Sequence, residues 1–256
     1  MLGFTEQTEA AIAIHQLSFA YPDQRPVLQD LSLSVSKGER LGLIGHNGCG
    51  KTTLFLLIAG ILTPLQGDIA VLGEIAKPGR FRPEIGVVFQ NPNDQLFSAS
   101  VWEDVAFAPQ NLGLPPALVQ ARVQEALAVT GTTALANRAP HHLSGGEKRM
   151  VAIAGVLAMV PQILLYDEPT ANLDLRARRR LIQFLHQSQQ TMVIASHDLE
   201  FILEVCDRVA LMEVGCIAAQ GTPQQMMSNT TLMHSHGLEV PHSLAERYPT
   251  DKFSVR

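Results

Sequence analysis

A glycine-rich loop between a short apolar strand and an apolar helix constrains this chain most. Residues 45–52 read GHNGCGKT, which fits the pattern GxxxxGK[ST] in full. The run from Arg40 to Ile44 predicts a strand before the loop, and LFLLIAGIL predicts a helix that ends before Pro64. Such a loop wraps phosphate oxygens with main-chain N–H groups at the positive end of a helix dipole. The sequence therefore predicts a phosphate-binding loop (P-loop).

The side chains of this loop predict ATP and Mg²⁺ as cofactors. We expect Lys51 to neutralise charge on the β- and γ-phosphates, and the hydroxyl of Thr52 to bind Mg²⁺. Cys49 could act as a redox switch, but a small residue simply suits the loop, and we favour that reading. The residues predicted to bind nucleotide here are Gly45, His46, Asn47, Gly48, Cys49, Gly50, Lys51, Thr52 and Thr53.

Two carboxylates and a histidine follow apolar strands farther along the chain. The segment ILLYDE ends in Asp167 and Glu168, and His197 follows the apolar run 192–196. Ligands of open α/β sheets bind at the carboxyl ends of strands, so these side chains should face the P-loop. We expect Asp167 to hold Mg²⁺, Glu168 to polarise the attacking water, and His197 to contact the γ-phosphate or orient Glu168. An exposed acidic turn and a structural histidine are the plainer alternatives.

The order of apolar patterns predicts an α/β fold with a doubly wound, mainly parallel core sheet. Residues 12–19 and 31–35 alternate apolar and polar side chains, which is typical of an N-terminal antiparallel β-subdomain. Continuous apolar runs at 86–89, 163–166 and 192–195 predict buried parallel strands. The Pro- and Ala-rich stretch between them predicts an inserted α-helical subdomain at about 91–160. We expect one domain over 1–222 and a C-terminal tail over 223–256.

Composition limits the compartment and the partners. The 256 residues carry a net charge of −5, which argues against nucleic acid as a partner. Three cysteines without a CxxC pair suit a reducing, intracellular setting. The first ten residues lack the basic region of a signal peptide. The longest apolar runs, 54–62 and 150–160, are shorter than the roughly 18 residues of a membrane span. We expect a protein that is soluble or peripheral to a membrane.

The segment LSGGE at 143–147 stands shortly before ILLYDE, and this ordered set resembles the ATPase subunits of ABC transporters over about residues 10–222. The resemblance implies that Ser144, Gly145 and Gly146 bind the γ-phosphate of a nucleotide held by a second ATPase subunit, identical or related. These residues before a helix would form an anion-binding nest, although a merely flexible helix start is the alternative.

Other residues match family motifs by position. Gln90 resembles the Q-loop glutamine, which touches Mg²⁺ or the attacking water and links to the membrane subunit. Tyr21 resembles the aromatic residue that stacks on adenine, although a tyrosine before proline is also a common turn packer. The segment 172–174 resembles the D-loop. The departures are Asn172, where a small residue is usual, and Glu147, where Gln is commoner. The implied catalytic residues are Lys51, Gln90, Glu168 and His197, with Mg²⁺ at Thr52, Gln90 and Asp167.

The segments VFQNPNDQLF and EDVAF, with the signature helix, resemble energy-coupling-factor and cobalt/nickel importer ATPases. This resemblance implies a transmembrane coupling subunit docked near Gln90 to Phe107, and a separate membrane subunit that captures cobalt, nickel or a vitamin. The chain would then lie on the cytoplasmic side of the cell membrane. The apolar residues of the docking segment could equally serve internal packing; they are Phe97, Val101, Trp102 and Phe107.

Three further readings remain open as alternatives. A nucleic-acid machine would usually show coiled-coil insertions, a second cassette or basic surfaces, and none of these is found in the sequence. A P-loop kinase or GTPase lacks support, because no acceptor-site or NKxD-type motif is present. The C-terminal tail could hold a transition metal, although a polar, mobile tail that happens to hold imidazoles is the better reading. The residues concerned are Met226, Met227, Met233, His234, His236 and His242.

Overall fold

The centre of the protein is a six-stranded sheet in the order β10-β9-β3-β8-β7-β6. We describe a computed structural model over residues 10–75 and 80–245. Neighbouring strands from β6 to β9 run parallel, and β10 pairs antiparallel with β9. The strands are β3 (Arg40–Ile44), β6 (Ile85–Val88), β7 (Ile163–Asp167), β8 (Thr191–Ala195), β9 (Arg208–Glu213) and β10 (Cys216–Gly221). The expected mainly parallel core sheet is therefore confirmed.

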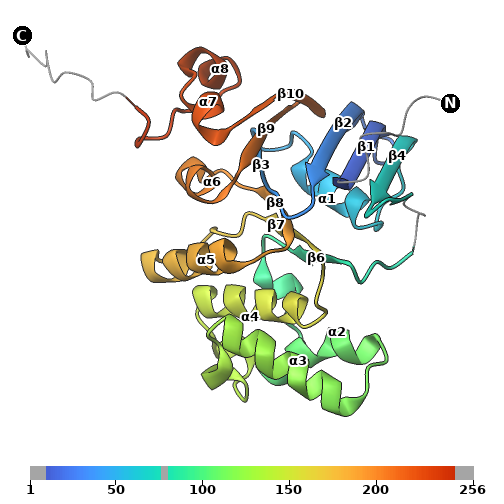
Figure 1. The fold of residues 1–256 in the computed structure, drawn as a ribbon, viewed down its shortest axis with the longest axis vertical. Helices are drawn as coiled ribbons and strands as arrows, with labels where there is room; N and C mark the ends of the chain where they lie inside the picture. Colours follow the sequence, from blue (N-terminus) through green and yellow to red (C-terminus); the bar gives the residue numbers. More distant parts are fainter. Residues whose placement is uncertain (1–9, 76–79, 246–256) are drawn as a thin grey trace, which may run out of the picture.

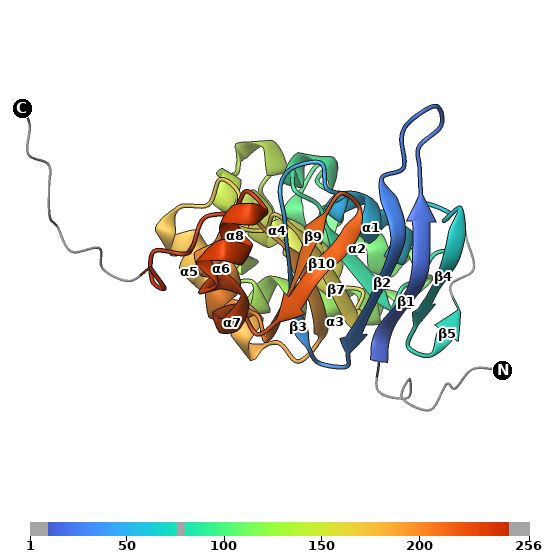
Figure 2. The ribbon, with the colours of Figure 1, turned by 90° about the horizontal axis from the view of Figure 1, so that it is seen from above.

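Both faces of this sheet are buried, which explains why its strands are apolar without alternation. Leu165 and Val193 point to one side, and Leu164 and Ile194 point to the other. One face is covered by α1 (Lys51–Ile58) and by a separate antiparallel sheet in the order β2-β1-β4-β5 (Figure 2). The strands of that sheet are β1 (Ala10–Phe19), β2 (Leu28–Ser36), β4 (Gln66–Val71) and β5 (Glu74–Ile75). The opposite face is covered by α4 (Gly145–Leu157), α5 (Leu175–Gln187) and α6 (Leu199–Val205).

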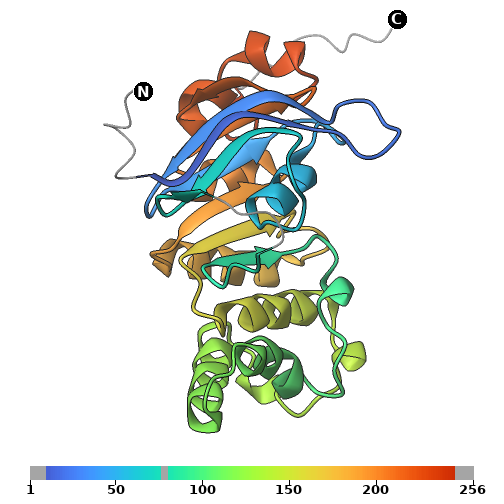
Figure 3. The same ribbon diagram turned by 90° about the vertical axis from the view of Figure 1, so that its right-hand side faces the viewer.

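The helical subdomain lies between β6 and β7 in the chain and forms one end of the molecule (Figures 1 and 3). Its helices are α2 (Val101–Asn111), α3 (Pro116–Val129) and α4 (Gly145–Leu157), within the expected 91–160 insertion. They share a small core of their own. A 3₁₀ turn at Pro92–Asp94 precedes α2, and two more, at Thr133–Leu135 and Pro140–His142, lie between α3 and α4. Helix α4 also packs on β6, where a Cβ at Gly86 would stand 2.3 Å from Val156 Cγ1.

The C-terminal segment differs from the expected mobile tail, because residues 223–245 fold back onto the core. Two short helices, α7 (Pro223–Met227) and α8 (Thr230–Ser235), continue from the β9–β10 hairpin. Met227 and Met233 are completely buried against the sheet. Helices of five or six residues span fewer than two turns, so they leave little periodicity for the sequence to reveal. Residues 246–256 lie outside the described part of the chain.

The transition-metal reading of this segment gains no support. Its methionines serve the core, and His236 Nε2 lies 3.3 Å from Glu213 Oε2. Within residues 10–75 and 80–245, three or more His, Cys, Asp or Glu side chains do not gather in a metal-binding group. The same residues include no helix of the length and apolarity that a membrane crossing needs.

We predict that Met233→Ala lowers the free energy of unfolding by about 2–5 kcal/mol, because it leaves a cavity beneath α8. The exposed neighbour on the same helix provides a matched control, and His234→Ala should stay within about 0.5 kcal/mol of the wild type. Urea unfolding monitored by circular dichroism measures both variants. Equal, small effects of the two substitutions would mean that α8 does not belong to the folded core.

Candidate functional site

A cavity of about 160 Å³ brings together residues from five separate segments of the chain. It lies at the carboxyl edge of the central sheet, where β3, β6, β7 and β8 end. Parallel strands deliver their following residues to one edge, so the register places these side chains together. The lining consists of Val27, Asn47, Gly48, Gly50, Lys51, Thr52, Thr53, Gln90, Asp167, Glu168 and His197. All of them except Val27 were candidates from the sequence.

The P-loop adopts a conformation that demands glycine at two positions. Gly45 has φ of 148°, and a Cβ there would stand 2.2 Å from the carbonyl oxygen of Met212. Gly50 has φ of 107° and would bring a Cβ within 2.7 Å of Leu28. Lys51 Nζ donates to the carbonyl oxygens of Gly45 and His46, at 2.8 and 3.1 Å. The ammonium group therefore folds back across the loop, at the start of α1, where helix polarity favours an anion.

The side chains of Thr52 and Asp167 meet across this edge of the sheet. The Thr52 hydroxyl donates to Asp167 Oδ2 at 2.7 Å. Close by, Glu168 Oε1 is buried and accepts no hydrogen bond. The Thr52 hydroxyl and the Asp167 carboxylate are hard oxygen donors of the kind that Mg²⁺ prefers, and the amide of Gln90 lines the same cavity. The residues present therefore fit a Mg²⁺ ion.

Glu168 is held by the last residue of β8 and by the two residues that follow it. Its φ is 48°, and its N–H donates to the carbonyl oxygen of Ala195 at 2.8 Å. Its Oε2 accepts from the hydroxyl of Ser196 at 3.3 Å and from the N–H of His197 at 3.1 Å. These contacts fix the carboxylate through Oε2, whereas Oε1 accepts no hydrogen bond.

His197 bridges the P-loop and Glu168. Its Nε2 lies 2.6 Å from Asn47 Oδ1 and 3.3 Å from Glu168 Oε1. The shorter contact has hydrogen-bond geometry, whereas the longer one only brings the two groups close. The next residue in the chain, Asp198, accepts a hydrogen bond from Arg178 Nε of α5 at 2.9 Å. The sequence did not single out the contacts of His197 with Asn47 or of Asp198 with Arg178.

Arg149 of α4 is the main residue that sequence reasoning missed. Its side chain is 1% exposed, and it donates to the carbonyl oxygens of Phe89 and Gln90 at 2.6 and 2.5 Å. Burial lowers the pKa of this guanidinium, and the nearby carboxylates of Asp167 and Glu168 oppose that effect. A single arginine beside a glycine-rich motif carries no pattern that would reveal its burial.

The signature residues lie outside the cavity of their own chain. The Ser144 hydroxyl accepts from the N–H of Glu147 at 3.3 Å, and Glu147 accepts in return from the N–H of Ser144 at 2.8 Å. This capping box begins α4 and lowers the pKa of Glu147. Gly145 instead approaches the carbonyl oxygen of Asn172, 3.7 Å from the position of its absent Cβ. Asn172 itself has φ of 61°, a conformation that asparagine tolerates well.

Tyr21 stands beside the P-loop without lining the cavity. Its hydroxyl lies 3.3 Å from the hydroxyl of Thr53, and its ring packs edge-on against Phe19 at 5.0 Å. The structure therefore leaves both sequence readings of this tyrosine available, since it contacts the loop and also packs in the turn after β1.

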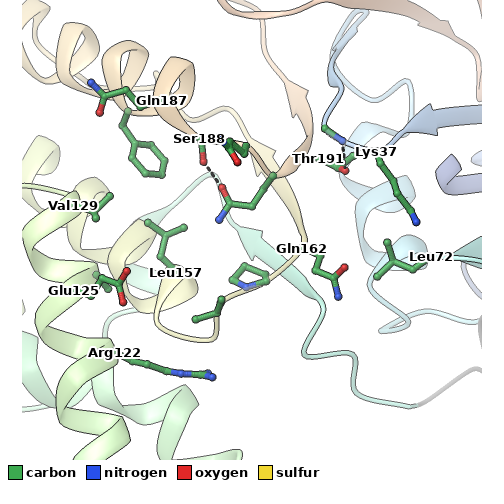
Figure 4. A pocket seen from close by; sticks show the side chains of 17 residues that line it. Lys37, Leu72, Arg122, Glu125, Val129, Leu157, Gln162, Gln187, Ser188 and Thr191 are labelled. Carbon is green, nitrogen blue, oxygen red and sulfur yellow. Dashed lines mark hydrogen bonds between the residues drawn. The ribbon is translucent and has the colours of Figure 1, made fainter. Parts of the chain in front are cut away.

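A larger cavity of about 680 Å³ opens at the opposite edge of the sheet, between the helical subdomain and the starts of β7 and β8 (Figure 4). Its wall includes Arg122 and Leu157 on one side and Gln162 and Thr191 on the other. The predicted site residues do not line it. Phosphate-binding groups, rather than volume, therefore make the smaller cavity the candidate nucleotide site.

A parallel sheet with a P-loop, paired carboxylates and a histidine at its carboxyl edge defines a P-loop ATPase. A family model described as ABC transporter matches residues 28–171, and the chain belongs to this family. It is 61% identical to a Synechocystis sp. protein provisionally called an ABC transporter ATP-binding protein, over 91% of this chain and 82% of that one.

One further relative and one solved structure are also similar to this chain. The energy-coupling factor transporter ATP-binding protein EcfA of Methanothermobacter thermautotrophicus is 44% identical, over 91% of this chain and 77% of that one. The structure of cbiO1 from Clostridium perfringens, described as part of the ABC transporter complex cbiONQ, superimposes with a TM-score of 0.79. It is 36% identical and covers 89% of this chain and 94% of that chain. The protein is thus an ATP-binding ATPase subunit of an ABC transporter.

We predict that alkylation of the native protein at pH 8 labels Cys216 and spares Cys49 and Cys206. Cys216 is exposed, whereas burial raises the pKa of both other thiols and so lowers their reactive thiolate fraction at this pH. Peptide mass spectrometry after short iodoacetamide treatment measures each site, with urea-unfolded protein as the control in which all three react. Rapid labelling of Cys49 in the folded protein would revive the redox-switch reading.

Proposed function

We propose that this chain is the MgATP-hydrolysing subunit of an energy-coupling-type importer, and that a separate transmembrane partner carries the substrate. The observation that carries the proposal is the cavity shared by the P-loop, Gln90, Asp167, Glu168 and His197. The likeness to EcfA and to cbiO1 supports the energy-coupling type. The cargo would be cobalt, nickel or a vitamin, and it need not contact this chain.

Nucleotide binding would rearrange the contacts of Lys51. Its ammonium now satisfies two loop carbonyl oxygens, and phosphate oxygens would offer it stronger, charge-assisted hydrogen bonds. The main-chain N–H groups of the loop and of the first turn of α1 would hold the β-phosphate. Tyr21 would pack on the adenine, beside Thr53. Bound Mg²⁺ would neutralise phosphate charge, with Thr52, Gln90 and Asp167 as the residues around it.

Hydrolysis would depend on the free oxygen of Glu168. Because Oε2 already accepts two hydrogen bonds, Oε1 is the atom able to accept a proton from the attacking water. His197, fixed by Asn47, stands beside that oxygen and would hold the water or the γ-phosphate in line. Gln90 lines the same cavity and would complete the geometry. The ammonium group of Lys51 would stabilise the negative charge that develops on the phosphate oxygens.

A second ATPase subunit would complete each site, since Ser144, Gly145 and Gly146 do not line the cavity of their own chain. Their position at the N-terminus of α4 suits a phosphate presented by that second subunit. ATP binding would close the pair, and hydrolysis with phosphate release would reopen it. The chain itself offers both halves of a site, so identical or related chains could pair.

The membrane partner would dock on the helical subdomain next to Gln90. Phe97 is 64% exposed and Phe107 is 48% exposed, and their rings stack edge-on with centroids 4.8 Å apart. Val101 is buried and Trp102 is partly buried, so these two serve internal packing. An exposed aromatic pair suits an amphipathic helix of a partner. The subunit would then sit peripherally on the cytoplasmic face of the membrane.

We predict that Glu168→Gln keeps ATP binding and loses turnover by about 10²–10⁴-fold, because the amide cannot accept the proton of the attacking water. Phosphate release measures turnover, and a fluorescent ATP analogue measures binding. Glu125→Gln, an exposed change on α3, is the matched control and should retain wild-type rates. Near-normal phosphate release by the Glu168 variant would contradict the assigned role.

We predict that affinity capture of the wild-type chain from detergent-solubilised source membranes recovers a polytopic membrane protein and a small substrate-capture subunit. Phe97→Asp should weaken this recovery by about tenfold or more, since it places a charge in an apolar contact. Leu118→Asp, also exposed on the helical subdomain, should leave recovery unchanged. Recovery of nucleic acid or ribosomes in place of a membrane protein would overturn the importer assignment.

A further inference from the structure

Arg82 is a buried arginine whose hydrogen-bond donors are unused. The residue is 8% exposed, and its Nε is enclosed by protein without an acceptor. Within residues 10–75 and 80–245, its guanidinium forms neither a hydrogen bond nor a salt bridge. Burial lowers the pKa of this group, and the charge of Glu84 opposes that effect. An enclosed cation with unused donors is costly in a folded protein unless a ligand uses them.

The end of α1 offers a structural explanation for this residue. Gly60 follows the C-cap of α1, and a Cβ added there would stand 3.5 Å from Arg82 Nε. Helix polarity favours a cation at this end of a helix. An arginine that caps a helix, however, donates to the last carbonyl oxygens, and Arg82 makes no such bond in the part of the chain that the structure describes. The helix end therefore explains the charge but not the unused donors.

Arg82 lines a cavity of about 390 Å³ at the amino ends of β6 and β7, opposite the edge that holds the candidate nucleotide cavity. The other charged residues of its wall are Arg80, Glu74 and Glu84. Arg80 and Glu74 are exposed, so water screens their charges, whereas the guanidinium of Arg82 belongs to the buried wall. A phosphate or carboxylate group is the acceptor that matches the fork of donors on an arginine.

This cavity adjoins the larger one of about 680 Å³, because Leu72 and Gln162 line both. In Figure 4 these two residues lie across the larger cavity from Val129. The larger cavity has apolar side chains in its wall, among them Leu157 and Val160, and Val160 is 58% exposed. A ligand whose charged group reaches Arg82 would therefore meet apolar surface where Leu72 joins the two cavities.

We propose that Arg82 is the base of a binding site for a small organic anion that carries a phosphate or carboxylate group on an apolar body. The charged group binds the guanidinium of Arg82 with support from Arg80, and the apolar body lies against Leu72 toward the larger cavity. The site is separate from the nucleotide cavity and does not depend on the proposed function.

Three substitutions test the site. Arg82→Met removes the guanidinium and keeps an apolar stem, whereas Arg82→Lys keeps the charge and loses the fork of donors. Leu72→Asn removes the apolar contact, and asparagine tolerates the φ of 51° at this position. Arg176→Met, an exposed change on α5, is the matched control for loss of an arginine. Without any probe, Arg82→Met should raise Tm by about 2–4 °C, because it relieves the desolvated donors.

The probes are phenyl phosphate, benzoate and inorganic phosphate at constant ionic strength. A non-hydrolysable ATP analogue with Mg²⁺ fills the nucleotide cavity throughout. Calorimetric titration measures each dissociation constant, and NMR of protein labelled with ¹⁵N-arginine follows the Arg82 Nε–H signal, which Arg82→Lys assigns. We expect phenyl phosphate or benzoate to shift this signal saturably and to bind at least tenfold more tightly than inorganic phosphate.

We expect Arg82→Met and Arg82→Lys each to weaken binding of the organic anion by about tenfold or more, since a bidentate contact is lost. Leu72→Asn should weaken the organic probe to the level of inorganic phosphate, and Arg176→Met should stay within about twofold of the wild type. If Arg82→Met does not fold, Arg82→Lys decides the matter.

Several results would overturn the inference. Neither organic probe might shift the Arg82 signal, or binding might persist unchanged in the Arg82 variants. Inorganic phosphate that binds as tightly as the organic probes would show a site for a bare ion instead. A fall in Tm on Arg82→Met, with no response of the wild type to any probe, would assign Arg82 to the end of α1 alone.

Discussion

The parallel register of β3, β6, β7 and β8 is the constraint on which the rest of this structure depends. Because these strands point the same way, the residues that follow them emerge at one edge, where the hydrogen bond of Thr52 to Asp167 joins two of them. Burial of both sheet faces fixes that register, since a slip by one residue would exchange the side chains packed on the two layers. The same strand register therefore determines both the packing of the core and the geometry of the site.

Around this edge, some polar atoms have hydrogen-bond partners within the protein and others have none. Glu168 Oε2 is held by two donors, whereas Oε1 accepts no hydrogen bond although it is buried. The Lys51 ammonium donates hydrogen bonds to two loop carbonyl oxygens, which the oxygens of a bound phosphate could replace. Such unmet capacity is costly in a folded protein unless a ligand uses it. The pattern agrees with the chain's membership of the ABC transporter family.

The helical subdomain adds a second level of organisation. It has its own small core, yet α4 packs both on the central sheet and, through Arg149, on the loop at Gln90. The proposed membrane contact at Phe97 and Phe107 lies on the chain segment that continues from this loop. The candidate nucleotide cavity, the signature and the proposed docking surface are consequently connected by short, hydrogen-bonded stretches of backbone.

The sequence by itself determined the fold class and nearly the whole lining of the candidate nucleotide cavity, because a P-loop and strand-terminal acids are local patterns that fix where side chains lie. Only the tertiary structure decided three other features. It buried Arg149 against two carbonyl oxygens, joined His197 to Asn47, and folded Met227 and Met233 into the core in place of a mobile tail. The first two depend on contacts between residues far apart in the chain, and the third depends on helices too short to leave a periodic pattern. Local sequence patterns reveal neither kind of feature.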